Sequence, residues 1–437
     1  MVKKSSVLFD KHSLNSYTKT CQGDGSDKVV IIMLNVKTPE EVNEIIKSLM
    51  TCSIRESFKC ENIKAVNALG RILHQDIIAQ ENVPGFNRST VDGYAVLSSD
   101  TFGCSEGLPS VLKLTGEVLM GESADEPVKS GFCVIVSTGG EVPDGADAVV
   151  MHEFTEDYGS GLIGMQKPVA PGANIIFKND DAAKGDVILK SGLKITPHDI
   201  GILSALGYIN VDVRCKPVAG VISTGDELVA AGAVPKNGQV RDVNLPMLCA
   251  ALHKFGADVK DFGIMKDEEA LIHAAMMEAA PICDFVLISG GSSAGTRDMT
   301  AKIIESEGEI LLHGIAMKPG KPTILGVVKE KPVFGLPGHP VAAYMVTELF
   351  VRPLISGLTG AEDKRKTTKA TLSEAISSNH GREEYIVVRL DEKGETAAPV
   401  KGKSGLISGL SEVDGYICVP RDCEGLAKGE EVVVIYF

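Results

Sequence analysis

Short polar segments in the second half of the chain contain the residue types that bind phosphate. They are STGDE at 223–227, KD at 266–267, SGGSSAGTRD at 289–298, KPGKP at 318–322 and LPGHP at 336–340. Glycine-rich turns and helix N-termini present backbone N–H groups to anions, and lysines add positive charge. Prolines stiffen the turn that carries Lys318 and Lys321, and Pro340 suits the first position of a helix with free N–H groups.

The same segments carry the carboxylates of Asp226, Glu227, Asp267 and Asp298. Carboxylates beside a phosphate-binding turn repel an anionic ligand unless a cation such as Mg²⁺ bridges them. The combination therefore predicts a phosphorylated or nucleotide ligand bound together with a divalent metal. Each segment alone also has a simpler explanation, as a turn that only reverses the chain, a lysine in solvent or an aspartate that caps a helix. Their joint occurrence favours a binding site.

Strands and helices alternate around these segments over residues 213–360. The expected strands are PVAGVIST (217–224), DVKDFGIM (258–265), DFVLISGG (284–291), PTILGVV (322–328) and PVFGLPG (332–338), and the expected helices are NLPMLCAALHKFG (244–256), DEEALIHAAMMEAA (267–280), RDMTAKIIESEG (297–308) and PVAAYMVTELFVRPLISGL (340–358). Such alternation predicts βαβ units on a largely parallel sheet. Ligands bind such a sheet outside the carboxyl ends of its strands, where the polar segments fall.

The rest of the chain divides into smaller parts. TPEEVNEIIKSLMTC (38–52) reads as an amphipathic helix with Thr38 as its cap. Residues 82–165 hold short β-like runs separated by turns such as PDGAD, which predicts an inserted β domain. Residues 368–437 return to short β runs and predict a small C-terminal β domain. Residues 1–37 form an N-terminal appendage that we expect to be disordered or peripheral.

Composition and missing motifs exclude several classes of function. The net charge of −14 argues against a general binder of nucleic acid or anionic membranes. The ten cysteines show no C-x-x-C spacing, so we expect reduced, cytosolic thiols and neither a structural zinc site nor a disulfide framework. No apolar run reaches the length of a membrane span. The chain lacks the P-loop, dinucleotide-binding and nucleophile-elbow motifs.

Three further segments in the first half could bind a ligand or could only turn the chain. NVPGFNRSTVDGYAV (82–96) clusters Arg88, Ser89, Asp92 and Tyr94 between two turns. STGGEVPDGADAVV (137–150) places Thr138 before a glycine pair that could meet a phosphate, and Asp181 follows a second aspartate in a polar loop. The residues alone do not choose between these two explanations.

Seven motifs together resemble one family, the molybdopterin molybdenumtransferases or MoeA family, which includes the E domain of gephyrin. They are PGFNRSTVDGYAV (84–96), STGGEVPDGADAVVMHE (137–153), PGANI with DDAAKGD (171–186), STGDEL (223–228), SGGSSAGTRDMT (289–300), KPGKP (318–322) and GLPGHPVAA (335–343). They occur in family order over about residues 38–437. One such motif is a weak signal, but seven in order are specific.

The resemblance implies an elongated four-domain subunit that forms a homodimer, in which residues 38–81 and 166–212 make a linker and dimerisation domain. It implies an active site between the α/β domain of one subunit and the small β domain of the other. The reaction implied is insertion of molybdate into adenylylated molybdopterin in the cytoplasm, with release of AMP and help from Mg²⁺.

The resemblance also implies roles for particular residues. Asp226, Glu227, Asp267 and Asp298 serve the metal and pyrophosphate region, and the two lysines of KPGKP hold molybdate or phosphate. The residues expected to contact the nucleotide or pterin are Ser223, Thr224, Gly225, Ser289, Gly290, Gly291, Ser292, Gly295, Pro337, Gly338 and Pro340. Asp92, Thr138 and Asp181 are expected from the other subunit, and Ser404 matches a serine of the last domain.

The chain departs from the family pattern at some positions, and other functions compete with the one that the resemblance implies. His339 stands where asparagine is usual, and the basic run before Asp181 is reduced to Lys178, so either Lys178 or Arg297 could supply a basic contact to molybdate. The rivals are a molybdopterin adenylyltransferase, an enzyme that inserts tungstate, and a non-catalytic scaffold on the same fold. Retention of the four carboxylates and both lysines favours catalysis.

Overall fold

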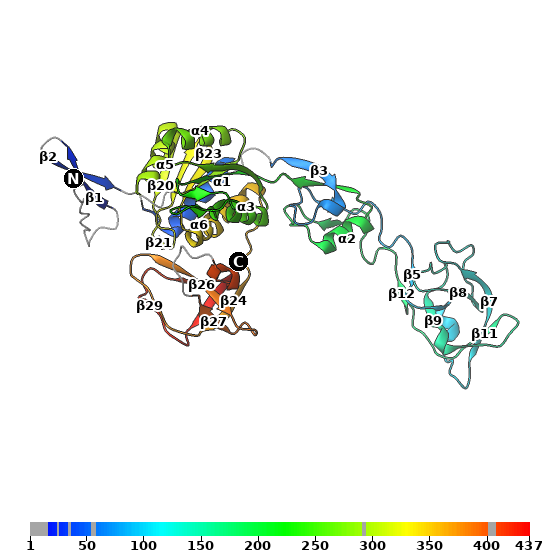
Figure 1. The fold of residues 1–437 in the computed structure, drawn as a ribbon. Coiled ribbons are helices and arrows are strands. Elements are labelled where there is room, and N and C mark those ends of the chain that lie inside the picture. Colours follow the sequence, from blue (N-terminus) through cyan, green and yellow to red (C-terminus); the bar gives the residue numbers. More distant parts are fainter. Residues whose placement is uncertain (1–15, 24–25, 34–35, 54–57, 291–293, 401–407) are drawn as a thin grey trace. The chain divides into compact units, whose positions relative to one another are not determined.

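The computed structural model describes the chain apart from residues 1–15, 24–25, 34–35, 54–57, 291–293 and 401–407 (Figure 1). The chain divides into two compact units, one formed by residues 1–61 with 214–437 and the other by residues 62–213. Each unit has hydrophobic clusters of its own. The predicted strand-end segments lie in the first unit, whereas Asp92, Thr138 and Asp181 lie in the second.

The first unit is built on a six-stranded sheet. Its strands follow the order β18 (Asp258–Met265), β15 (Val218–Thr224), β19 (Phe285–Ser289), β23 (Lys331–Leu336), β22 (Ile324–Val328) and β20 (Gly308–His313). The first four strands are parallel, which confirms the predicted βαβ arrangement. β22 runs antiparallel to both of its neighbours. Only Lys329 and Glu330, both at positive φ, separate β22 from β23, and so short a link makes a hairpin instead of a crossover.

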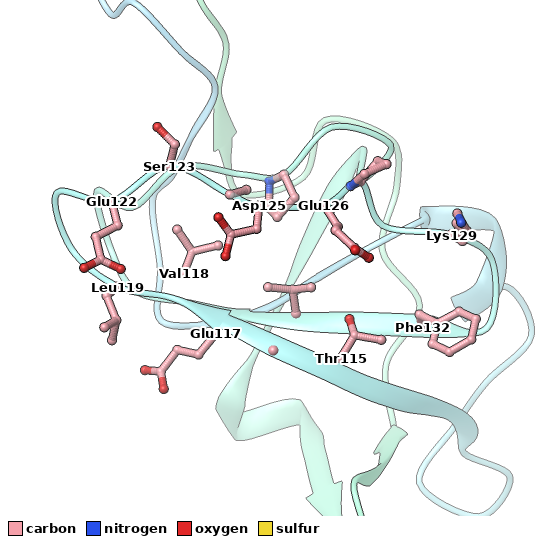
Figure 2. Close-up of a pocket in the computed structure, with 15 residues that line it drawn as sticks. Thr115, Glu117, Val118, Leu119, Glu122, Ser123, Asp125, Glu126, Lys129 and Phe132 are labelled. Atoms are coloured by element: carbon pink, nitrogen blue, oxygen red, sulfur yellow. The ribbon is translucent and has the colours of Figure 1, made fainter.

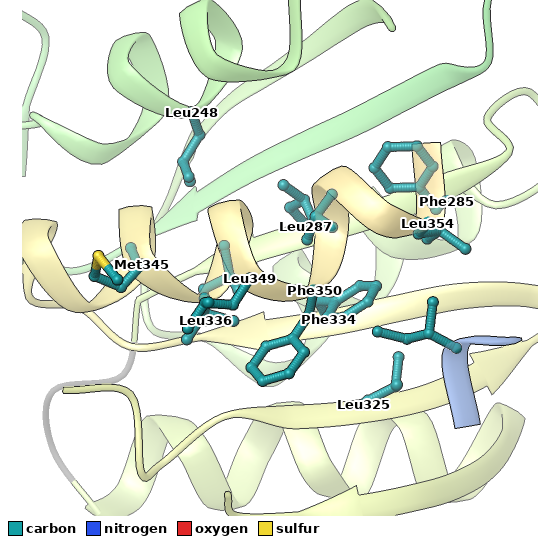
Figure 3. Close-up of a cluster of buried hydrophobic side chains, with 14 of the residues drawn as sticks. Leu248, Phe285, Leu287, Leu325, Phe334, Leu336, Met345, Leu349, Phe350 and Leu354 are labelled. Atoms are coloured by element: carbon teal, nitrogen blue, oxygen red, sulfur yellow. The ribbon is translucent and has the colours of Figure 1, made fainter. Parts of the chain in front are cut away.

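Helices cover both faces of this sheet. They are α1 (Pro39–Ser53), α3 (Asn244–Phe255), α4 (Glu269–Ala279), α5 (Ala294–Glu307), α6 (Pro340–Val346) and α7 (Arg352–Thr359), with a π-helical turn at Thr347–Val351. Successive strand residues point to opposite faces. Leu287 therefore joins the hydrophobic cluster that includes residues of α1, α3, α6 and α7, whereas Val286 and Ile288 join the cluster with α4 and α5. Figure 3 shows the first cluster between the sheet and the α6–α7 segment.

α1 packs on this α/β core. Its predicted start is confirmed, because the hydroxyl of Thr38 accepts the N–H of Glu41 at 3.2 Å and the Glu41 carboxylate accepts the N–H of Thr38 at 2.7 Å. Val42 is 1% exposed within the first cluster. A Cβ on Gly357 of α7 would lie 1.5 Å from the sulfur of Met50, so glycine lets the two helices close. α1 therefore belongs to the first unit.

Pro340–Thr359 is long and apolar enough, by length and composition, to cross a membrane. In the structure 67% of its most apolar window is buried inside the protein. Phe350 and Leu354, each 1% exposed, belong to the first hydrophobic cluster. The apolar character of this segment is therefore accounted for by packing in the core.

The C-terminal β domain is a closed ring of strands. The ring contains β24 (Thr367–Leu372), β26 (Glu383–Leu390), β27 (Thr396–Pro399), β28 (Gly415–Val419) and β30 (Glu431–Tyr436). It closes because β26 pairs with both β27 and β28. The short strand β21 (Met317–Lys318), from the α/β part of the chain, adds parallel to the start of β26. Smaller pairs in the first unit include β25 (Ile376–Ser377) with β29 (Gly425–Leu426) and β16 (Leu228–Val229) with β17 (Val240–Arg241).

The second unit contains the predicted inserted β domain. Its six-stranded sheet has the order β10 (Thr155–Asp157), β11 (Leu162–Met165), β7 (Ser110–Val118), β8 (Phe132–Val136), β6 (Gly93–Val96) and β9 (Ala148–Met151). The other elements in this unit or at its boundary are β3 (Cys60–Lys64), β4 (Ile77–Ile78), β5 (Arg88–Ser89), β12 (Ile175–Ile176), β13 (Val187–Leu189), α2 (Pro197–Ala205) and β14 (Asn210–Arg214). Thr196 and Asp199 form a capping box at the start of α2.

Residues 16–33 of the predicted appendage contain a hairpin. β1 (Ser16–Gly23) and β2 (Ser26–Met33) pair antiparallel. The four 3₁₀ turns of the described chain are Ala65–Asn67, Ser98–Thr101, His152–Phe154 and Ser408–Glu412. The first of these lies within IKAVNALG (63–70).

Candidate functional site

The ends of β15 and β19 meet at a glycine. Ser223, Thr224 and Ser289, at the carboxyl ends of these strands, are 1%, 3% and 1% exposed. A Cβ on Gly290 would lie 1.9 Å from the hydroxyl oxygen of Thr224, so only glycine allows the two chain segments to approach this closely. Among the residues that the structure describes, the hydroxyl groups of Ser223 and Thr224 have no hydrogen-bond partner. The end of β15 therefore holds two buried hydroxyl groups that could hydrogen-bond to a ligand.

The end of β18 joins the same edge. The N–H of Gly225 donates to the carbonyl of Met265 at 3.1 Å, and the N–H of Asp267 donates to Oδ1 of Asp226 at 3.2 Å. Glu227 packs over Gly225, because a Cβ there would lie 2.9 Å from Oε2 of Glu227. The structure thus brings Asp226, Glu227 and Asp267 to one corner of the sheet, as the position of these segments after parallel strands predicts.

The fourth predicted metal ligand cannot be compared with these three. Asp298 lies in α5, but its side chain is outside the described part of the structure, as are Gly291 and Ser292. Among the side chains that the structure does describe, no three His, Cys, Asp or Glu residues gather into a metal-binding group. The metal site therefore stays a prediction. Gly295 also lies in α5, and Ser404 falls outside the described residues.

The turn at residues 318–322, here called the lysine turn, is held between the sheet and the C-terminal ring. Lys318 lies on β21, and its ammonium is 2.5 Å from Oε1 of Glu384 on β26. The carbonyl of Lys321 accepts the N–H of Ile315 at 2.9 Å. Behind the turn, the hydroxyl of Thr323 donates to the carbonyl of Gly320 at 2.7 Å. These contacts fix the backbone on both sides of the two lysines.

Asn244 connects the end of β19 to the turn before α6. Its Nδ2 donates to the hydroxyl of Ser289 at 2.8 Å and to the carbonyl of Gly338 at 2.9 Å. Because a carbonyl only accepts, the contact with Gly338 fixes which amide atom faces it. Asp242 in turn accepts the N–H groups of Asn244 and Leu245 at 3.0 and 3.2 Å.

These two residues were missed by the sequence reasoning. The available signal was the pair of cap-forming residues in DVN (242–244), directly before an apolar helix. The other predicted members of this edge, Pro337 and Pro340, flank the turn, and Pro340 is the first residue of α6.

The predicted residues of the second unit lie in two loops. Oδ1 of Asp92 accepts the N–H of Thr138 at 2.7 Å and its hydroxyl at 3.1 Å. These hydrogen bonds, the backbone one first, hold the pKa of Asp92 below its usual value. Asp181 is exposed, and its N–H donates to the carbonyl of Val83 at 3.1 Å. The structure therefore joins Asp92 to Thr138 and leaves Asp181 at the surface of its unit.

A separate pocket of about 520 Å³ opens beside β7 and β8 in the second unit (Figure 2). Its labelled lining includes Glu117, Glu122, Asp125 and Glu126, with Lys129 at one side. None of the predicted site residues lines it. An acidic pocket repels an anionic pterin or oxyanion, so its position does not move the candidate site away from the strand ends.

Family models match the chain in three consecutive regions. Residues 37–207 match the "MoeA N-terminal region (domain I and II)", residues 220–357 the "Probable molybdopterin binding domain" and residues 369–437 the "MoeA C-terminal region (domain IV)". The second match covers the sheet and the strand-end edge. The α/β core therefore defines a domain of the molybdopterin-binding class.

Similarity over nearly the whole chain narrows the class to a family. The molybdopterin molybdenumtransferase of Bacillus subtilis is 31% identical over 411 residues, which cover 92% of this chain and 95% of that protein. The Staphylococcus aureus N315 protein of the same name is 31% identical over 409 residues, which cover 92% and 97%. The crystal structure of the molybdopterin biosynthesis MoeA protein from Pyrococcus horikoshii OT3 has a TM-score of 0.80, with 33% identity and coverage of 92% and 100%. The chain belongs to the MoeA family.

Proposed function

We propose that this protein is a molybdopterin molybdenumtransferase of molybdenum cofactor biosynthesis. It takes adenylylated molybdopterin and molybdate, inserts molybdenum into the dithiolene of the pterin, and releases AMP. The reaction depends on Mg²⁺, and the enzyme works in the cytoplasm as a homodimer. Family membership supports the class of reaction, and the chemistry of the strand-end edge supports the substrates.

The observation that carries the proposal is the mixture of groups at one edge of the sheet. The end of β15 offers the buried hydroxyls of Ser223 and Thr224, and α6 starts with Pro340 beside the end of β19. Such donors suit the pyrophosphate of an adenylylated pterin. The lysines at 318 and 321 suit molybdate, which is a dianion.

The carboxylates suit a divalent cation. Asp226, Glu227 and Asp267 supply hard oxygen ligands at one corner, and Asp226 already accepts the N–H of Asp267. Mg²⁺ is commonly bound by one or two carboxylates together with substrate phosphates. We propose that these residues and Asp298 would hold Mg²⁺, which would supply positive charge to offset that of the phosphates.

The residues of the second unit complete the proposal. Asp92, Thr138 and Asp181 act on the site of the partner subunit in the homodimer. The pairing of Asp92 with Thr138 keeps the Asp92 carboxylate oriented, since it accepts two hydrogen bonds from one residue. A monomeric protein with full activity would contradict this part of the proposal.

The test is AMP release from adenylylated molybdopterin, measured with and without molybdate and Mg²⁺. We expect release that requires the cation and responds to molybdate. Asp226→Asn should lower the rate by at least about tenfold and raise the Mg²⁺ concentration needed. Asp258→Asn is the matched control, because Asp258 starts β18, which runs parallel to β15, and so lies at the edge of the sheet opposite to Asp226. Absence of release by a correctly folded protein would refute the enzymatic function, and equal effects of the two substitutions would refute the metal assignment.

A further inference from the structure

The ion pair between Lys318 and Glu384 joins two parts of the fold. Lys318 stands on the turn between β20 and β22, whereas Glu384 is on the first long strand of the C-terminal ring. β21 and β26 pair in parallel with Lys318 opposite Glu384. The N–H of Glu383 also donates to the carbonyl of Ala316 at 3.0 Å. Backbone pairing therefore sets the position of both side chains.

The two members of the pair differ in exposure. The side chain of Glu384 is 10% exposed, and that of Lys318 is 48% exposed. The second carboxylate oxygen of Glu384 accepts the hydroxyl of Ser378 at 2.9 Å. Both oxygens of Glu384 are therefore engaged, and the carboxylate is fixed. The lysine ammonium, in contrast, has three donors and uses one of them on Glu384, so it keeps donors that face solvent.

Ordinary surface pairs in the same domain look different. Lys369 and Glu431 are joined at 2.8 Å, with side chains 73% and 65% exposed. Such a pair contributes little, since both flexible ends remain in water. A buried carboxylate, by comparison, costs free energy unless it is fully paired, and its surroundings have to hold it in one place. The arrangement at Lys318 is that of a fixed anion that orients an exposed cation.

We infer that Glu384 is a positioning residue for the oxyanion substrate, acting through Lys318. This inference rests on the proposed function. Glu384 holds the ammonium at one point of the site, and its negative charge offsets part of the attraction between Lys318 and a tetrahedral dianion. The substrate is therefore bound in a defined place but not so tightly that it resists transfer to the pterin.

Glu384→Gln tests both parts of the inference. The amide keeps the shape and one hydrogen-bond acceptor but removes the charge. We expect the KM for molybdate to fall by about tenfold, because the dianion no longer faces a nearby carboxylate. We expect kcat to fall by about tenfold as well, because the ammonium is no longer held in place. Glu384→Asp, which keeps the charge, should return KM towards the wild-type value.

Two further variants separate positioning from a purely structural role. Ser378→Ala keeps the charge and the ion pair but frees the second oxygen of Glu384, so it should leave KM near the wild-type value and lower kcat by a smaller factor than Glu384→Gln does. Glu431→Gln removes an exposed pair of the same domain and should leave both constants unchanged. If Glu384→Gln folds normally and leaves KM unchanged or raises it, the inference is wrong. If Glu384→Gln does not fold, an unchanged kcat in Ser378→Ala overturns it.

A readout without turnover distinguishes this inference from the proposed function. Lys318 can be labelled with a lysine-specific acylating reagent and quantified by mass spectrometry, with molybdate alone as the protecting ligand. Labelling should be about fivefold faster in Glu384→Gln, because the amine is released from the carboxylate, and molybdate should protect it more strongly. These changes in a protein that releases no AMP would overturn only the proposed function. Equal labelling and protection in both proteins would overturn the inference even in an active enzyme.

Discussion

Replacement of Arg365 by methionine should destabilise the first unit by disrupting a buried cluster of charges. Arg365 lies on the connection between α7 and β24. Its guanidinium donates to the hydroxyl of Tyr416 at 2.7 Å, to the carbonyl of Glu348 at 3.2 Å and to the carboxylate of Asp363 at 3.2 and 3.3 Å. Arg352 links the two carboxylates, at 2.6 Å from Glu348 and 2.9 Å from Asp363.

The size of the effect follows from what the substitution leaves behind. Glu348 is 0% exposed, and its burial raises its pKa, so an ionised Glu348 depends on both arginines nearby. Removal of one partner of a buried ion pair costs about 3–5 kcal/mol when the other charge is left uncompensated, but here Arg352 still contacts both Glu348 and Asp363. The side chain of Arg365 is 20% exposed, which places the expected loss near the lower end, at about 3 kcal/mol. Methionine has a similar length and limits any additional cavity.

The measurement is guanidinium chloride denaturation followed by far-UV circular dichroism. The matched control is Arg389→Met, because Arg389 contacts Glu412 at 3.1 Å with side chains 59% and 68% exposed. An exposed pair of this kind contributes at most about 1 kcal/mol. The midpoint should therefore move clearly for Arg365→Met and hardly for Arg389→Met, with the slope unchanged. Equal shifts for the two variants would refute the argument from burial.

Three further predictions concern the site and the core. Gly290→Ala should lower the free energy of unfolding by about 1–3 kcal/mol and remove most of the activity, because the new Cβ would lie 1.9 Å from a hydroxyl at the end of β15. The control is Gly201→Ala in α2, where a Cβ would have nothing within 4 Å, and this variant should not reduce thermal stability. Asn244→Ala should lower the free energy of unfolding by about 2 kcal/mol and slow AMP release, because the carbonyl of Gly338 and the hydroxyl of Ser289 lose the Asn244 donor. Unchanged stability together with an unchanged rate of AMP release would contradict a role of Asn244 in linking these two groups. Burial raises the pKa of the Cys133 thiol to about 12, so alkylation near neutral pH should reach the exposed Cys60 and not Cys133. Since the folded protein favours the neutral thiol, the contribution of Cys133 to stability is complete below the ordinary thiol pKa of 9.0 and is lost as the pH rises towards about 12. Comparison of alkaline unfolding between the wild-type protein and Cys133→Ser measures this loss.

Local sequence patterns were sufficient for most of the α/β core. The alternation of apolar strands with amphipathic helices predicted β15, β18, β19, β22 and β23 with the helices between them, because buried parallel strands are apolar on both faces. It did not predict β20, whose residues GEILLH directly follow α5 and mix polar with apolar side chains. The pattern also could not show that β22 is reversed, since that depends on the two-residue link after it.

The proximity of the residues predicted at the strand ends followed from the same pattern, whereas the contacts that support them did not. Asp226 and Asp267 follow parallel strands, so their neighbourhood is a consequence of topology. The contact of Lys318 with Glu384 depends instead on how the C-terminal ring docks, and no local pattern encodes that. The docking of α1 is similar, because it depends on the space that Gly357 leaves for Met50.

The short strand β21 bears on how this protein can be divided for experiments. It lies between β20 and β22 in sequence, yet its hydrogen-bonding partner is β26 of the C-terminal ring. A truncation after residue 366 would leave the backbone N–H and C=O groups of β21 without that partner, and unpaired strand edges invite aggregation. The lysine turn would lose its support in the same step. The α/β core and the C-terminal ring are therefore separate in sequence but form one piece for expression and dissection.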